Sequence, residues 1–197
     1  AHVNNNLYDA VPHDAYREML RPEKTSALMT AMLEKKWLGN KVGQGFYKQE
    51  RVNGAREFWT LNPETMTHEP TPKVRFDSIG AVRNVEDLGE RVRKLLTFDD
   101  RAANYVRDTL YYGFAYAAYV APEIAYRLSD VDDAMRWGFS HEAGPFEMWD
   151  MLGVAETVEK MEAQGLTVAP WVKEMLAAGH ESFYTQNGTA QVYDFNA

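Results

Sequence analysis

The chain has 197 residues and no cysteine, which excludes disulfide bonds, thiolate metal sites and cysteine nucleophiles. Its formal net charge of −8 argues against non-specific nucleic-acid binding and against docking on an anionic membrane. Ala1 to Asn6 lack the apolar core of a signal peptide, and the longest charge-free run, Thr109 to Pro122, is too short to span a bilayer. We therefore expect a soluble, cytoplasmic protein with no membrane span and no nucleic-acid partner.

The first predicted elements are a helix and a hairpin. Thr25 can cap the helix, and Gly39 is expected to end it. Its apolar face is formed by Leu28, Met29, Met32, Leu33 and Trp37. A strand is predicted at Phe46-Tyr47-Lys48 and its partner over Glu57 to Leu61. Asn53-Gly54 predicts the turn between them, because both residues accept positive φ.

A linker is predicted next, because Asn62 to Lys73 holds three prolines and several threonines. A further helix is predicted from about Asn84. Its apolar face is formed by Val85, Leu88, Val92, Leu95 and Leu96.

The longest predicted helix carries a seam of apolar and small residues spaced by threes and fours. The seam consists of Ala103, Val106, Leu110, Gly113, Ala117, Val120 and Ile124. Tyrosines recur every seven residues beside it, at Tyr105, Tyr112, Tyr119 and Tyr126. Pro122 is expected to kink or restart the helix. The run Thr109 to Pro122 is apolar nearly all round, which favours a buried core helix; a subunit interface or a ligand groove is the alternative.

Short helices and a second hairpin are predicted for the last third. Ser129 and Asp132 resemble a capping box for a helix that ends at Gly138, and Pro145 suits the first turn of a helix that continues through Leu152. Two more helices and the hairpin are predicted at Val154 to Gln164, Pro170 to Ala178, and Phe183-Tyr184 with Asn187-Gly188 and Val192-Tyr193.

One pattern occurs twice: a helix, a glycine, Phe-Tyr, Asn-Gly and a strand. The landmarks are Gly39, Phe46-Tyr47 and Asn53-Gly54 in the first copy, and Gly179, Phe183-Tyr184 and Asn187-Gly188 in the second. This similarity indicates an internal repeat.

A search for catalytic chemistry finds no complete site. The cluster Gly39, Gly43 and Gly45 follows a helix and precedes a strand, whereas a dinucleotide fingerprint follows a strand and opens a helix, so tight turns are the favoured reading. The five histidines show no metal-ligand spacing. His141-Glu142 has the residue types of a general base and its orienter, but a solvated loop pair is favoured.

Three aspartates, Asp130, Asp132 and Asp133, have the residue type of a cation site but lack the glycine and the distal glutamate of a calcium loop. Favourable charge at a helix N-terminus is the preferred explanation. We therefore assign no catalytic, cofactor-binding or metal-binding residue to this chain.

Two segments carry a resemblance to a known family. The first runs from Asp130-Val131-Asp132-Asp133-Ala134-Met135 through Gly138 to Gly144-Pro145-Phe146-Glu147, with Asp150 and Gly153. The second is Leu38-Gly39-Asn40-Lys41-Val42-Gly43-Gln44-Gly45-Phe46-Tyr47. Together they resemble the C-terminal domain of the 3-hydroxyacyl-CoA dehydrogenases, which occurs twice in tandem in multifunctional fatty-acid oxidation proteins.

The resemblance implies a mainly α fold, a helical bundle like the C-terminal domain of 6-phosphogluconate dehydrogenase, with a small β-hairpin closing each repeat. Residues 1–61 are expected to be the C-terminal part of a first, truncated repeat. Residues 62–84 are expected to be a linker, and residues 85–197 a second, complete repeat.

The family oxidises 3-hydroxyacyl-CoA to 3-oxoacyl-CoA with NAD, in fatty-acid β-oxidation. Its NAD site and its catalytic histidine and glutamate belong to an N-terminal Rossmann domain, for which this chain has no matching motif. A substrate-contacting asparagine of the family falls near Arg107, and Asn104 is out of register, so neither is carried over. The chain is expected to be an inactive piece of a longer enzyme.

The implied partners are the Rossmann domain, the acyl-CoA of the complete enzyme, and a second copy bound through the apolar helix. Two alternatives remain. One is a stand-alone helical interaction or acyl-binding module that uses the tyrosine-rich helix as its groove. The other is an autonomous hydrolase that uses His141 and Glu142.

Overall fold

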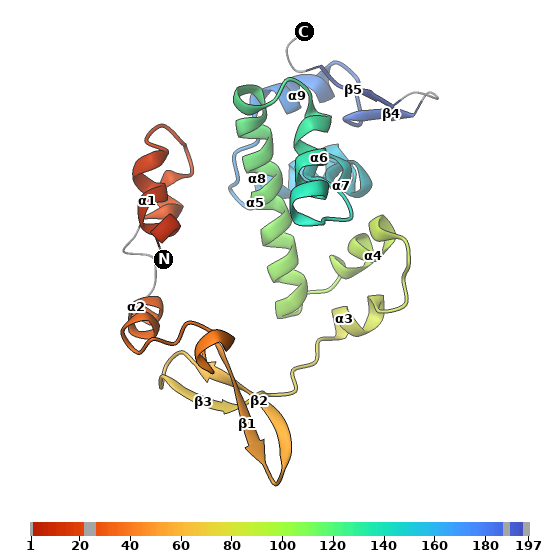
Figure 1. Cartoon of the computed structure of the whole chain (residues 1–197). Helices are drawn as coiled ribbons and strands as arrows, with labels where there is room; N and C mark the ends of the chain where they lie inside the picture. The colour runs from red at the N-terminus through yellow and green to blue at the C-terminus, as the bar shows by residue number, and fades with distance from the viewer. Residues whose placement is uncertain (1, 22–26, 187–189, 195–197) are drawn as a thin grey trace. The chain divides into compact units, whose positions relative to one another are not determined.

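The computed structural model describes residues 2–21, 27–186 and 190–194, and the chain divides into two compact units, residues 1–74 and 75–197. Both units are shown in Figure 1, and helices predominate, with small antiparallel sheets. Among the described residues, no helix is long and apolar enough to cross a membrane. The predominance of helices confirms the expected fold class, mainly α.

Unit 1 consists of short helices followed by a three-stranded antiparallel sheet in the order β1-β2-β3. Its elements are α1 (His2–Ala10), two 3-10 turns (Arg17–Leu20 and Asn40–Val42), α2 (Ala27–Glu34), β1 (Tyr47–Val52), β2 (Ala55–Asn62) and β3 (Thr67–Pro70). Asn53 and Gly54 form the predicted turn, with φ values of 51° and 82°, and Val52 pairs with Ala55. These left-handed conformations match the twist of the strands, so the hairpin is confirmed.

Two predictions for this region are wrong. Helix α2 ends at Glu34 instead of Gly39, because Lys36 adopts a left-handed conformation with a φ of 58°. The interval 62–84 is not a plain linker: β3 pairs with β2, and α3 (Asp77–Val82) follows. The threonines suit an edge strand, whose last residue, Pro70, needs no ladder donor. The proposed cap Thr25 lies outside the described residues.

Unit 2 is a set of helices around α5 (Arg101–Ile124), which lies beside α6 and α7 (Figure 1). Its other elements are α3, α4 (Leu88–Leu95), α6 (Leu128–Phe139), α7 (Pro145–Leu152), α8 (Val154–Ala163), α9 (Pro170–Ala177), and the paired strands β4 (Tyr184–Gln186) and β5 (Ala190–Val192). Helices α4 to α9 and the strand pair confirm the predicted elements, although α4 begins at Leu88 instead of near Asn84. The turn residues Asn187-Gly188 lie outside the described part of the chain.

An aromatic cluster fills the core of unit 2. Phe114 of α5 stacks on Trp149 of α7 with ring centroids 5.1 Å apart. Phe183, which precedes β4, lies 5.1 Å from the ring of Phe146 and 5.3 Å from that of Trp149. All four side chains are buried, so α5, α7 and the start of the β4–β5 hairpin share one core.

Helix α5 is capped at its start and continuous to its end. Asp100 accepts hydrogen bonds from Ala103 N at 3.0 Å and from the backbone and hydroxyl of Ser78, which ties α3 to α5. Helix α5 continues through Pro122 to Ile124, so the predicted restart at this proline is wrong. A proline has no N–H for the carbonyl four residues earlier. Instead, that carbonyl, of Ala118, accepts a 2.8 Å hydrogen bond from Trp171 Nε1.

Helix α5 is buried on one side only. Tyr111, Phe114, Ala115, Ala118 and Ala121 face the core. By contrast, the four tyrosines of the seven-residue pattern are exposed: Tyr105, Tyr112, Tyr119 and Tyr126. The structure thus contains both the core helix and an apolar surface that sequence reasoning treated as alternatives.

Helix α6 differs from its prediction at both ends. It starts at Leu128, and Ser129 does not cap it. It runs past Gly138 to Phe139 and is ended by Ser140, which adopts the left-handed conformation with a φ of 58°. The role expected for Asp132 as part of a capping box is also wrong, since this carboxylate caps α7 instead.

Candidate functional site

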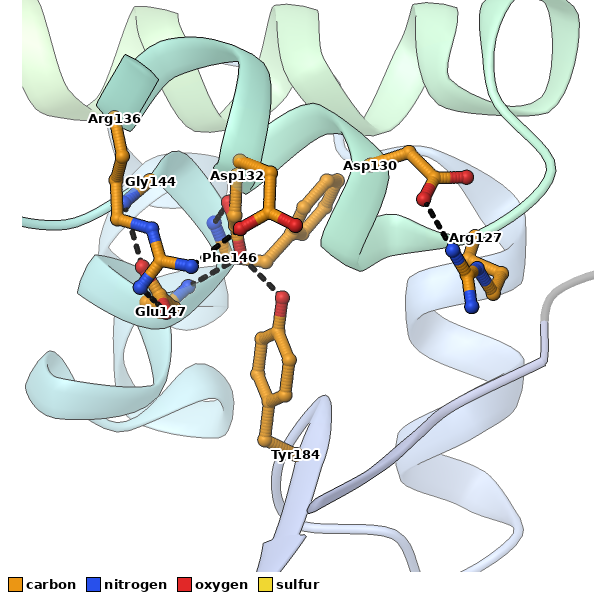
Figure 2. A network of polar contacts seen from close by, with 9 residues as sticks. Arg127, Asp130, Asp132, Arg136, Gly144, Phe146, Glu147 and Tyr184 are labelled. Carbon is orange, nitrogen blue, oxygen red and sulfur yellow. Dashed lines mark hydrogen bonds and ion pairs between the residues drawn. The ribbon is translucent and has the colours of Figure 1, made fainter.

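The segment Gly144-Pro145-Phe146 forms the start of α7, with Pro145 in the first turn as predicted. Glycine has no side chain with which to cap the helix. Asp132 of α6 supplies the acceptor: its Oδ1 accepts from Phe146 N at 2.9 Å and its Oδ2 from Glu147 N at 3.2 Å (Figure 2). Glu147 in turn accepts from Gly144 N at 2.8 Å. Two of the donors at the start of α7 are thus satisfied by a carboxylate of the neighbouring helix, and a third by Glu147 of α7 itself.

Residue 144 must be glycine because of space rather than backbone conformation. Its φ of −79° is accessible to any residue. A Cβ at this position, however, would overlap the Cα and Cβ of Asp132. Gly144 therefore lets α6 and α7 approach closely enough for the carboxylate to reach the helix start.

The closing hairpin is held by the same two helices. Tyr184 points toward Asp132 in Figure 2, and its hydroxyl donates to Oδ2 at 2.5 Å. Asp150 of α7 accepts from Phe183 N at 2.8 Å and from Tyr184 N at 2.9 Å. Two carboxylates thus fix the start of β4 to the α6–α7 pair.

These carboxylates lie in a partly apolar environment. Burial raises the pKa of Asp132 to about 6, and the hydrogen bonds from Tyr184 and Phe146 oppose that rise. Burial likewise raises the pKa of Asp150 to about 6. The pKa of Tyr184 is also raised, first by burial and then by its bond to Asp132. The hydrogen bonds of Asp132, Asp150 and Tyr184 join α6, α7 and the start of β4.

The remaining aspartates of this segment are paired with arginines. Arg127 contacts Asp130 at 2.9 Å, and Arg136 pairs with Asp133 and with Glu147. Over the described residues, no group of histidines and carboxylates is arranged to hold a metal ion. The structure does not bring Asp130, Asp132 and Asp133 together as a cation site.

The other candidate residues also have structural partners. Glu142 forms a 2.7 Å ion pair with Arg91 rather than orienting His141, whose ring lies 6.2 Å from that of Phe139. This arrangement does not support the hydrolase alternative. Arg107 donates to two backbone carbonyls before α5, at 3.0 and 2.8 Å, and to Asn104.

An apolar groove of about 780 Å³ runs along α5 in unit 2. It is lined by residues of α5, α6, α7 and the loop between α6 and α7, together with Leu88 of α4. Lining residues include Gly113, Ala117, Val120, Val131, Met135 and Met148. Gly113 is exposed, and a Cβ added there would meet no atom within 4 Å. The groove has the shape and chemistry to accept an apolar chain or a helix.

Comparison with known proteins identifies the region. A probable 3-hydroxyacyl-CoA dehydrogenase of Bacillus subtilis is 37% identical over 195 residues, which cover 98% of this chain. The chain is homologous to part of a 3-hydroxyacyl-CoA dehydrogenase. The family resemblance expected from the sequence is thereby confirmed.

A second relative is named as a putative trifunctional enzyme. This Rickettsia felis protein, named for a fatty acid oxidation complex, is 25% identical over 147 residues, or 74% of this chain. The chain spans 24% of the Bacillus subtilis protein and 18% of the Rickettsia felis protein. No family model matches the chain.

Proposed function

We propose that this chain is the helical substrate-cleft and dimerisation region of an NAD-dependent 3-hydroxyacyl-CoA dehydrogenase of fatty-acid β-oxidation. The observation that carries the proposal is the 37% identity to the Bacillus subtilis dehydrogenase across nearly the whole chain. The enzyme would be cytoplasmic, in agreement with a chain that contains no cysteine.

The described residues do not fit an NAD site. A dinucleotide site needs a strand that leads through a glycine-rich turn into a helix. Here Gly39 and Gly43 take φ values of 102° and 85° between α2 and β1, and the described strand pairs are all antiparallel. NAD binding and the chemical step are therefore proposed for other parts of the longer enzyme, and this chain alone is expected to be inactive.

In the proposed organisation, the chain contains the end of one copy of a domain and the whole of a second copy. Residues 1–61 would close a first repeat, and residues 85–197 would form a second, both of the type found in 6-phosphogluconate dehydrogenase. Support comes from the two hairpins, because each begins with a Phe-Tyr pair and follows a glycine with positive φ, Gly39 or Gly179.

An activity assay tests the proposal. The chain is incubated with 3-hydroxyacyl-CoA and NAD, and NADH release is recorded at 340 nm, with the polypeptide of the complete reading frame as the positive control. The complete polypeptide is expected to turn over, and the chain alone is expected to give no signal. Turnover by the chain alone would contradict the assignment of catalysis to other regions.

The groove along α5 is the proposed surface for self-association. Tyr116 and Ile124 line it and are exposed, and apolar patches of this kind mark contacts between subunits. Gly113→Arg places a charge in the groove without a clash inside unit 2, because the added Cβ meets open space. Gly138→Arg is the matched control, since Gly138 is also helical and open but lies outside the groove.

Sedimentation velocity at high concentration provides the readout. The chain and Gly138→Arg are expected to associate, and Gly113→Arg is expected to remain monomeric. If the two variants associate equally, the groove is not the surface of self-association.

The groove also favours a second candidate, a stand-alone acyl-binding module. Calorimetric titration with a long-chain acyl-CoA separates the two. Saturable binding by the chain, lost in Gly113→Arg and kept in Gly138→Arg, together with a reading frame that contains no dinucleotide-binding motif, would favour the module. Binding absent from the chain but present in a longer active enzyme would favour the dehydrogenase region.

A further inference from the structure

The two hairpins share a sequence and a backbone geometry. The segments Phe46-Tyr47-Lys48-Gln49 and Phe183-Tyr184-Thr185-Gln186 have the form Phe-Tyr-x-Gln. In each, the tyrosine begins a strand and pairs with the last partner residue, Thr60 or Val192.

The same hydrogen bond closes both hairpins. The phenylalanine carbonyl accepts a 2.8 Å bond from the backbone N–H that follows this partner residue, donated by Leu61 to Phe46 and by Tyr193 to Phe183. The backbone therefore holds the two Phe-Tyr pairs in equivalent positions at the start of their hairpins.

Their surroundings differ. Phe183 is fully buried among Phe146, Trp149 and Trp171, with ring centroids 5.1 to 5.8 Å away. Within unit 1, by contrast, Phe46 is 49% exposed and Tyr47 is 59% exposed. Two adjacent large side chains that are so exposed on an ordered hairpin indicate a contact surface.

The polar contacts differ in the same way. Asp150 accepts from both backbone N–H groups of the second pair, Phe183 and Tyr184. Among the described residues, the N–H of Phe46 donates to no acceptor. The N–H of Tyr47 points away from β2, because the bond from Leu61 N to Phe46 O makes Tyr47 and Thr60 a non-hydrogen-bonded pair. The donors that Asp150 binds in one hairpin therefore face outward in the other.

We propose that Phe46 and Tyr47 dock onto a helical body built like α6, α7 and α9, in which a carboxylate at the place of Asp150 accepts both backbone N–H groups. The partner is expected to resemble the surroundings of Phe183 in unit 2, with an aromatic pocket for the phenylalanine and an acidic group beside it. The corresponding place in unit 2 is filled by Phe183 and Tyr184, so the partner is a second body of this kind. The Bacillus subtilis relative, of which this chain spans 24%, has ample polypeptide to contain one.

This inference rests on the proposed repeat organisation and deepens it by naming the partner of the Phe46-Tyr47 surface of unit 1; it requires neither acyl-CoA nor NAD. A blank or positive enzyme assay leaves it unchanged. Its own failure would likewise leave the dehydrogenase assignment in place.

The first test uses unit 2 as the model partner after its own occupant is removed. In the variant F183S/Y184S, amide hydrogen exchange of Phe46 and Tyr47 is measured by NMR and compared with the unmodified chain. Both amides are expected to exchange at least about tenfold more slowly in the variant, through contact within or between chains. The added change F46S/Y47S is expected to abolish protection at residues 46 and 47, whereas the added change F58S, at an equally exposed position of β2, is expected to retain it.

The second test uses the polypeptide of the complete reading frame, in case the first variant does not fold. F46S/Y47S is expected to lower its thermal midpoint by several degrees and F58S to leave it unchanged, while neither alters the 197-residue chain. Protection of Phe46 and Tyr47 in either experiment supports the proposal. If both amides exchange freely in the folded variant, or F46S/Y47S and F58S behave alike in the complete polypeptide, the proposal is overturned.

Discussion

The two hairpins of this chain begin with the same Phe-Tyr pair, yet different interactions hold each pair. In unit 2 the pair is enclosed by α7 and α9 and bound by the carboxylates of Asp132 and Asp150. In unit 1 the pair stands on a regular hairpin with about half of each side chain exposed. The comparison teaches that the local sequence forms the hairpin, whereas packing against helices determines what the aromatic pair contributes to stability.

The largest expected effect comes from truncating the phenylalanine in each hairpin. Phe183→Ala should destabilise unit 2 by about 4 kcal/mol, because it leaves a cavity between three aromatic rings. Phe46→Ala should change the stability of unit 1 by less than about 0.5 kcal/mol, because that side chain is half exposed. Urea unfolding of both variants measures the two losses in unfolding free energy. Equal losses would contradict the claim that packing against helices distinguishes the two hairpins.

The next effect tests the close approach that allows the second hairpin to be clamped. Gly144→Ala should cost about 3 kcal/mol, because its Cβ overlaps Asp132 and separates the carboxylate from the start of α7. Gly80→Ala is the control: its Cβ meets open space in α3, so it should be neutral or stabilising by up to about 1 kcal/mol. A tolerated alanine at position 144, measured by thermal unfolding, would contradict the packing argument.

A smaller effect is expected from the tyrosine hydroxyls. Tyr184→Phe removes the donor to Asp132 and should cost about 2 kcal/mol, the usual value for a hydrogen bond to a charged group. Tyr47→Phe should have no measurable effect, because the Tyr47 side chain is largely exposed. Chemical unfolding curves of the pair decide, and a Tyr184→Phe variant as stable as the parent would make the Asp132 contact energetically irrelevant.

A further effect is a pH dependence confined to unit 2. Asp150 has a folded pKa of about 6, above its ordinary value of 3.8. Its contribution to stability is therefore complete below about pH 4 and is lost as the pH rises through about 6. Unfolding free energies between pH 4 and 7 should fall less steeply with pH in Asp150→Asn than in the parent, and Asp108→Asn, on the exposed surface of α5, should leave the slope unchanged. An unaltered slope in Asp150→Asn would show that this carboxyl does not titrate as described.

Features encoded by neighbouring residues were predictable from the sequence. Asn53-Gly54 specifies its turn through backbone conformation alone, and Pro145 specifies the first turn of α7. The family resemblance was also predictable, because it rests on short segments whose spacing is preserved.

Features that depend on distant residues were not predictable. Asp132 was interpreted as a charge near the start of its own helix, but the N–H groups it binds belong to residues 146 and 147. One signal was available: Gly144 precedes a helix and cannot cap it, so the acceptor had to come from elsewhere. The exposure of Tyr112 within an apolar helix was hidden for the same reason, since periodicity cannot tell a core face from an uncovered one.

Residue-resolved amide hydrogen exchange of the 197-residue chain tests the contrast between the hairpins most directly. The account predicts that the amides of Phe183 and Tyr184 are strongly protected, because both donate to Asp150, and that the amide of Phe46 exchanges at nearly the rate of an open peptide. Equal protection of Phe46 and Phe183 in the isolated chain would contradict it.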